Sequence, residues 1–92
     1  MAHENAFILT ANPNPSNGIV TLSFAGIRDA QVEVIDAVGR VVYRGTSARD
    51  AFTWRGTAQD GLAASGIYMV RVTGKNSVGR AVQAQMPVSI TR

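Results

Sequence analysis

The sequence contains no cysteine, a single histidine and no long run of apolar residues. Without cysteine the chain can form neither disulfide bonds nor thiolate metal sites, so its folding depends on an apolar core. No stretch approaches the roughly 18 apolar residues of a membrane-spanning helix, and the N-terminus has no charged-then-apolar pattern of a signal peptide. The one histidine, His3, lies near the N-terminus without a fixed partner, so it is not predicted to act as an oriented catalytic base.

Charge is also sparse, because only 16% of the 92 residues are charged while 46% are hydrophobic, which is the composition of a globular domain. The net charge is +3, but the basic residues are scattered singly and form no run. This pattern indicates a solvated basic surface and no nucleic-acid partner. The length fits one domain with one core and leaves little chain for a deep active-site cleft.

The residues that carry enzyme chemistry form no recognisable constellation. The six acidic residues show no short-spaced calcium-loop pattern, although a calcium site assembled from distant loops stays open at this stage. Asp29, Asp36 and Asp60 stand at expected turns, where their side chains are predicted to cap the backbone. Ser65 lacks the flanking pattern of a nucleophile elbow, and segments 61–66 and 74–79 do not fit nucleotide-binding loops. We therefore predict a protein that is not an enzyme and that has no cofactor and no metal.

Short runs with a period of two residues make up most of the chain. They are separated by segments rich in Gly, Asn, Asp and Pro, and they span residues 7–10, 19–24, 31–36, 41–43, 52–54, 66–72 and 82–90. Runs of this length and spacing predict an all-β fold, an Ig-like antiparallel β-sandwich of about seven strands with Greek-key connections. No internal repeat is apparent.

Alternation within the runs predicts which side chains point inward. The predicted core consists of Val20, Leu22, Phe24, Val32, Val34, Trp54, Tyr68, Val70 and Val72. Burial is favoured for Trp54, the alternative being an exposed platform that stacks on a sugar or a base. Pro87 predicts an edge strand or a bulge in the last run, and Gly39 predicts a turn with positive φ. The prolines of segment 12–18 predict a crossover loop that ends in an Asn-Gly turn.

Three segments occur together in the order and spacing of one known family. The first is Pro13-Asn14-Pro15-Ser16-Asn17-Gly18, the second is segment 32–42 with Asp36 before Gly39-Arg40, and the third is segment 64–72 with Ser65-Gly66 before Tyr68. The chain thereby resembles the type A C-terminal sorting domain of the type IX (Por) secretion system of Bacteroidetes-like bacteria. The resemblance extends over residues 7–92, and residues 1–6 are expected to be a flexible segment or to derive from expression.

This resemblance implies a non-catalytic sorting signal at the C-terminus of a longer cargo protein that is secreted or held at the cell surface, after passage through the periplasm. It implies two partners, the outer-membrane translocon and a sortase-like peptidase, besides the covalently linked upstream cargo domain. The suspected recognition residues are Gly39, Arg40, Gly66, Tyr68, Val88, Ile90 and Arg92. The resemblance implies that the glycines keep the turn geometry, that Tyr68 anchors the core, and that the last strand is presented to the translocon.

Two other functions are compatible with the same pattern. The Ig-like domain of the flagellar hook-capping protein shares the fold and the central hairpin pattern, and it would make this chain a structural assembly module. An accessory domain of an extracellular hydrolase would bind carbohydrate or space neighbouring modules. An Ig-like fold alone does not distinguish these functions from sorting.

Overall fold

The computed structural model describes residues 8–47, 50–58 and 61–92. These residues form nine strands and no helix. The strands are β1 (Leu9–Asn12), β2 (Val20–Phe24), β3 (Arg28–Ile35), β4 (Val41–Ser47), β5 (Ala51–Trp54), β6 (Thr57–Ala58), β7 (Gly61–Leu62), β8 (Gly66–Lys75) and β9 (Ala81–Ile90). The described part of the chain therefore contains no helix that could span a membrane.

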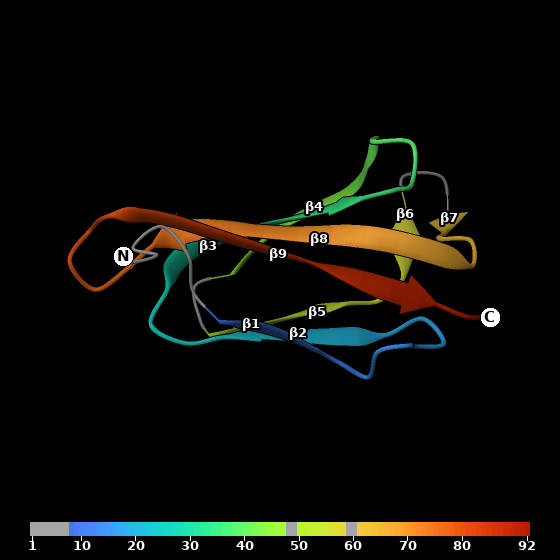
Figure 1. The fold of residues 1–92 in the computed structure, drawn as a ribbon, viewed down its shortest axis with the longest axis horizontal. Helices are drawn as coiled ribbons and strands as arrows, with labels where there is room; N and C mark the ends of the chain where they lie inside the picture. Colours follow the sequence, from blue (N-terminus) through green and yellow to red (C-terminus); the bar gives the residue numbers. More distant parts are fainter. Residues whose placement is uncertain (1–7, 48–49, 59–60) are drawn as a thin grey trace.

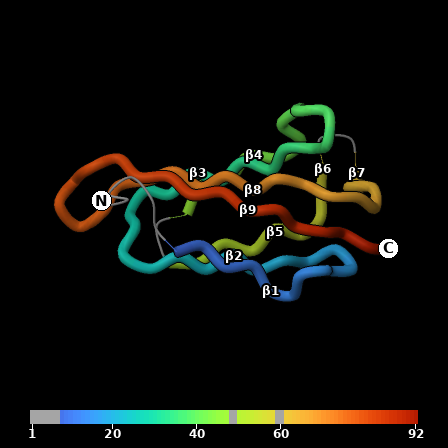
Figure 2. The backbone as a smooth tube through the Cα atoms, viewed as in Figure 1, coloured from blue at the N-terminus to red at the C-terminus, as the bar shows by residue number. Residues whose placement is uncertain are grey.

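Seven of these strands make the two layers of a sandwich (Figures 1 and 2). One layer has the order β1-β2-β5 and the other the order β4-β3-β8-β9, and all strand pairs are antiparallel. The chain passes between the layers after β2, after β4 and after β5, which gives the Greek-key character of Ig-like domains. The predicted all-β Ig-like sandwich is confirmed. The small β6–β7 ladder was not predicted.

The core lies between the two layers and is built from alternate strand residues. All nine predicted core residues are buried, which confirms the alternation. Trp54 is only 1% exposed and packs edge-on against Tyr68, with ring centroids 5.6 Å apart. Its indole Nε1 donates a hydrogen bond to the Thr57 carbonyl oxygen at 2.9 Å. The predicted burial of Trp54 is therefore confirmed, and an exposed stacking platform at this residue is excluded.

The segment rich in proline differs from its prediction as a crossover loop. It joins β1 to β2, and these two strands pair with each other in the same layer, so the loop does not cross between layers. Proline disfavours pairing inside a sheet, yet Ser16 of this segment forms a parallel bridge with Ile90 of β9. Only Pro13 and Pro15 lack an N–H donor, and the intervening residues keep theirs.

β9 is an edge strand, as Pro87 predicts, and Pro87 pairs in register opposite Met69 without a bulge. Its neighbour β8 continues to Lys75, and the turn between β8 and β9 spans residues 76–80. The predicted turn at Asp29 is also wrong, because Asp29 lies within β3 at a register shift, with φ of 54°.

Two hairpin turns share one hydrogen-bond pattern, although the sequence shows no obvious repeat. In turn 36–40, the Asp36 carboxylate Oδ1 accepts hydrogen bonds from the backbone N–H groups of Val38 and Arg40 at 3.1 and 2.9 Å. In turn 76–80, the Asn76 amide Oδ1 accepts the same two bonds at 3.1 and 3.0 Å. The predicted capping by Asp36 is confirmed, and so is the positive φ of Gly39, which is 91°.

Several predictions concern residues outside the described part of the chain. These are the flexible segment 1–6 with His3, the start of the first run at Phe7 and the turn residue Asp60.

Candidate functional site

The three sequence motifs meet at one end of the sandwich. In the four-stranded layer, Gly66 pairs with Ile90 and Ile35 pairs with Met69, which places the β3–β4 turn and the start of β8 at the same end as the end of β9. The bridge from Ser16 to Ile90 brings the proline loop to this end too. We call this surface the motif end and define it by residues 13–18, 36–40, 63–66 and 90–92. It lies at the side marked by the C-terminus in Figure 1.

The β3–β4 turn presents Gly39 and Arg40 to solvent at the motif end. Arg40 is held by an ion pair between its Nε and Asp36 Oδ2 at 3.0 Å, while 79% of its side chain stays exposed. The pKa of Asp36 is lowered, mainly because the Arg40 backbone N–H donates to its carboxylate. The Val38 backbone N–H and the Arg40 guanidinium also lower this pKa, and together these groups outweigh the effect of desolvation, which raises it. The turn is therefore a fixed, accessible feature that carries a cation.

Three of the suspected recognition residues are core residues. Tyr68 is 7% exposed, Val88 is fully buried and Ile90 is 2% exposed. The Tyr68 hydroxyl Oη donates to the Ala64 carbonyl oxygen at 2.6 Å, which ties the start of β8 to the preceding segment. The recognition role of these residues stays a prediction, but a receptor that binds the folded domain cannot contact these three side chains.

Gly66 and Arg92, the other two suspected residues, lie at the surface of the motif end. The Arg92 backbone N–H donates to Ser65 Oγ at 2.9 Å, and its guanidinium reaches back to carbonyl oxygens of Gly56 and Ala63. Gly56 and Ala63 could not be predicted as partners of Arg92, because they accept through backbone oxygens, which every residue type carries.

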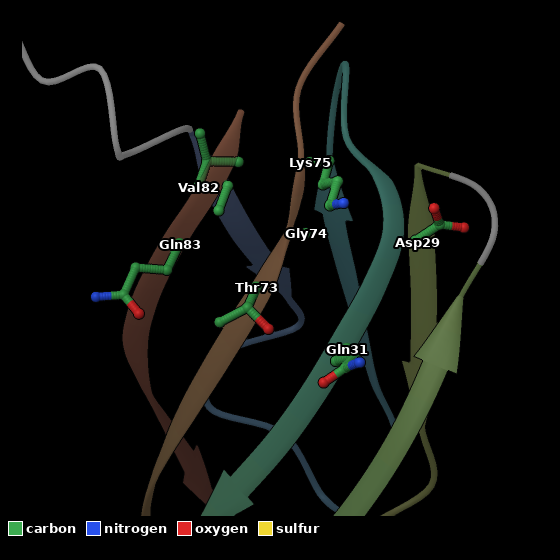
Figure 3. Close-up of a pocket in the computed structure, with 8 residues that line it drawn as sticks. Asp29, Gln31, Thr73, Gly74, Lys75, Val82 and Gln83 are labelled. Atoms are coloured by element: carbon green, nitrogen blue, oxygen red, sulfur yellow. The ribbon is translucent and has the colours of Figure 1, made fainter. Parts of the chain in front are cut away.

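A hollow with a volume of about 700 Å³ lies at the opposite end of the four-stranded layer. Figure 3 shows Gln31, Thr73 and Gln83 on three adjacent strands along it, and Thr73 pairs directly with both glutamines. Asp29 and Lys75 supply its charges. Neutral amides and a hydroxyl provide no nucleophile with an adjacent base.

Other side chains of the described residues do not assemble a reactive or metal-binding group. Among them no cluster of three His, Cys, Asp or Glu residues could hold a metal ion. Glu33 lies between Arg44 and Arg71, with nitrogen–oxygen distances of 3.3 and 3.4 Å, as a cross-strand ion-pair row on a sheet face. The large hydrophobic side chains exposed in the described chain are aliphatic, so they offer no aromatic row of the kind that binds sugars.

A family model described as the secretion system C-terminal sorting domain matches residues 10–82. A comparison with curated proteins finds no match.

Solved structures contain similar domains within larger proteins. PorZ of Porphyromonas gingivalis, described as an essential surface component of its type IX secretion system, is 27% identical over 91% of this chain with a TM-score of 0.67. PorU of the same organism is 20% identical over 90% of this chain with a TM-score of 0.65. The chain covers 11% of PorZ and 9% of PorU, so it corresponds to one small part of each.

The hook-capping protein FlgD of Xanthomonas campestris is also similar, with 20% identity, a TM-score of 0.59 and coverage of 88% of this chain and 63% of that protein. At this identity the likeness shows a shared fold only. The family match spans most of the chain and includes the complete β3–β4 turn and β8. The chain belongs to the secretion system C-terminal sorting domain family.

Proposed function

We propose that this domain directs an attached cargo protein through the outer-membrane translocon of a type IX secretion system, so that the cargo is secreted or held at the cell surface. The family match over residues 10–82 carries this proposal. The 27% identity to a domain of PorZ supports the assignment to the type IX system. A sortase-like peptidase that removes the domain is the second partner that the proposal includes.

The motif end is the surface proposed for contact with the translocon. It gathers accessible groups from segments far apart in the sequence, among them Gly39, Arg40 and Gly66, and a folded domain is needed to bring them together. Tyr68, Val88 and Ile90 then contribute by holding the strands from which these groups project. Recognition of such a composite surface would depend on the fold and on a few exposed side chains.

A reporter fusion tests the proposal. The whole chain is placed at the C-terminus of a fluorescent protein that carries an export signal to the periplasm, in a bacterium with a type IX system. The reporter is expected in the medium or on the cell surface, and it should stay periplasmic when the translocon gene is deleted. A reporter that remains periplasmic in the intact strain, while an established sorting domain exports it, contradicts the proposal.

A pair of variants tests the role of the motif end. Arg40 and Arg44 are both exposed arginines in ion pairs, but Arg40 lies in the β3–β4 turn and Arg44 lies along β4. Arg40→Ala is expected to lower export of the fusion severalfold, and the matched Arg44→Ala variant should export normally. Equal export by the two variants would show that the exposed turn is not the recognised surface.

A further inference from the structure

The guanidinium of Arg92 lies in a cradle of backbone oxygens at the motif end. Its Nε donates to the Ala63 carbonyl oxygen at 2.7 Å, and its Nη2 donates to the Gly56 carbonyl oxygen at 2.8 Å. Both bonds are partly buried. A hydrogen bond also joins the two sides of the cradle, because the Ala63 backbone N–H donates to the Gly56 carbonyl oxygen at 2.8 Å.

Two buried glycines form the walls beside the guanidinium. A Cβ atom on Gly56 would collide with the Gly18 carbonyl oxygen and would lie 2.7 Å from Arg92 Nη2. A Cβ atom on Gly18 would lie 3.2 Å from Nη1. Gly56 also has φ of 70°, in the left-handed region that favours glycine. The space for the planar group therefore exists because both walls lack side chains.

The chemistry of this cradle favours guanidinium over ammonium. Its acceptors are neutral carbonyl oxygens, and the ion pairs found among the described residues do not include Arg92. A guanidinium presents several N–H donors in a fixed planar fork, so Nε and Nη2 reach two carbonyls at once. A lysine ammonium is a compact group on a flexible stem and does not reproduce the planar fork between two glycine walls.

The residues before Arg92 are held by the proline loop. Thr91 N–H donates to the Ser16 carbonyl oxygen at 2.7 Å, and Ser16 N–H donates to the Ser89 carbonyl oxygen at 2.8 Å. The Asn14 side-chain amide continues this pairing, since its Oδ1 accepts from Ser89 N–H at 3.0 Å and its Nδ2 donates to the Pro87 carbonyl oxygen at 3.1 Å. Residues 87–91 are thus bound on their outer edge, and Arg92 closes the end of this pairing.

We propose that residues Gly18, Gly56 and Ala63 form a guanidinium-selective site that Arg92 occupies within the same chain, and that this occupancy locks the last strand into the sandwich. This proposal rests on the contacts of Arg92 alone and does not require that the domain act as a sorting signal. A partner that takes up residues 87–92 as a free strand must first remove Arg92 from the cradle. An arginine side chain supplied from outside would fit the same site once Arg92 is replaced.

Amide hydrogen exchange measured by NMR tests the lock locally. Arg92→Ala is expected to speed exchange at Ser89 and Thr91 by about tenfold or more, because hydrogen bonds from a charged donor are lost. Arg92→Lys should behave like Arg92→Ala. Exchange at Val70, in the middle of β8, should change far less, which separates local opening from global unfolding. Arg44→Ala serves as the control for loss of one exposed arginine.

Chemical rescue tests the site itself. N-acetyl-arginine amide, added at millimolar concentration to the Arg92→Ala protein, is expected to slow exchange at Thr91 and to shift the amide resonances of Gly56 and Ala63. N-acetyl-lysine amide should do neither. Unchanged exchange in Arg92→Ala, restoration of normal exchange in Arg92→Lys, or equal rescue by the two compounds would each overturn the proposal.

Discussion

Replacement of Tyr68 is the most direct test of how the core supports the motif end. Tyr68 is 7% exposed, packs edge-on against Trp54 and donates its hydroxyl to the Ala64 carbonyl oxygen. Tyr68→Phe removes only the hydroxyl, whereas Tyr68→Ala removes the ring as well. The two variants therefore separate the contribution of the hydrogen bond from that of the packed ring.

The structure sets the size of each effect. Loss of one hydrogen bond in Tyr68→Phe should lower the free energy of unfolding by about 0.5–1 kcal/mol, at the low end because Ala64 is exposed and its oxygen can accept from water. Tyr68→Ala also leaves a cavity and removes the aromatic contact, so a loss of about 3–5 kcal/mol is expected. For 92 residues the total stability is on the order of 5–10 kcal/mol, so Tyr68→Ala leaves a marginally stable domain.

Urea denaturation followed by Trp54 fluorescence measures both effects. With a denaturant slope of about 1 kcal/mol/M, Tyr68→Phe should move the unfolding midpoint by roughly 0.5–1 M. Tyr43→Phe is the control, because Tyr43 is half-buried and packs against Phe52 with ring centroids 6.0 Å apart, and it should change stability by less than about 0.5 kcal/mol. A loss below about 1 kcal/mol for Tyr68→Ala would refute the placement of this ring in the core.

Two further predictions concern the β3–β4 turn and Gly56, which lies beside Arg92. The pKa of Asp36 is lowered in the folded state, so its stabilising effect is fully present above the unfolded-state value near 3.8 and is lost as pH falls through the folded-state pKa. Asp36→Asn should remove this dependence of stability on acid pH and should keep the turn, because Asn76 accepts the same two hydrogen bonds in turn 76–80. An Asp36→Asn protein whose stability depends on pH as the unmodified protein's does would contradict this prediction. Gly56→Ala should cost at least about 2 kcal/mol in thermal or urea unfolding through the left-handed φ and the collision with Gly18, whereas Gly26→Ala, with φ of 76° but open space, should cost less. Equal losses for the two variants would show that the contact with Gly18 contributes nothing.

Alternation predicts the core well wherever a strand is regular. A strand has two faces, so one inward residue determines the others, and Val20, Leu22 and Phe24 are all buried as predicted. The method misses Ala30, which follows the irregularity at Asp29 where the register shifts. It also misses Ala63, which lies between β7 and β8 outside any strand. The β6 and β7 strands have two residues each, too few for a period to be seen.

The repeated hairpin turn was missed for a chemical reason. Segments 36–40 and 76–80 read Asp-Ala-Val-Gly-Arg and Asn-Ser-Val-Gly-Arg, and their first residues differ in charge. Both residues nevertheless place one side-chain oxygen where it accepts the same two backbone N–H groups. The shared Val-Gly-Arg is too short to mark a repeat by itself, whereas the equal hydrogen-bond capacity of Asp36 and Asn76 extends the match to the first residue of each turn.

The seven suspected recognition residues divide into two physical classes, and the sequence assigned only Tyr68 to the predicted core. Gly39, Arg40, Gly66 and Arg92 are exposed, whereas Tyr68, Val88 and Ile90 belong to the core. If the translocon binds the folded motif end, a Tyr68 variant should lose export only in proportion to its unfolded fraction. Arg40→Ala should lose export although the free energy of unfolding of the domain is unchanged. Export normalised to the amount of folded domain therefore distinguishes contact residues from residues that support the fold. Failure of Tyr68→Phe to export at normal stability would mean that the receptor reads an opened chain.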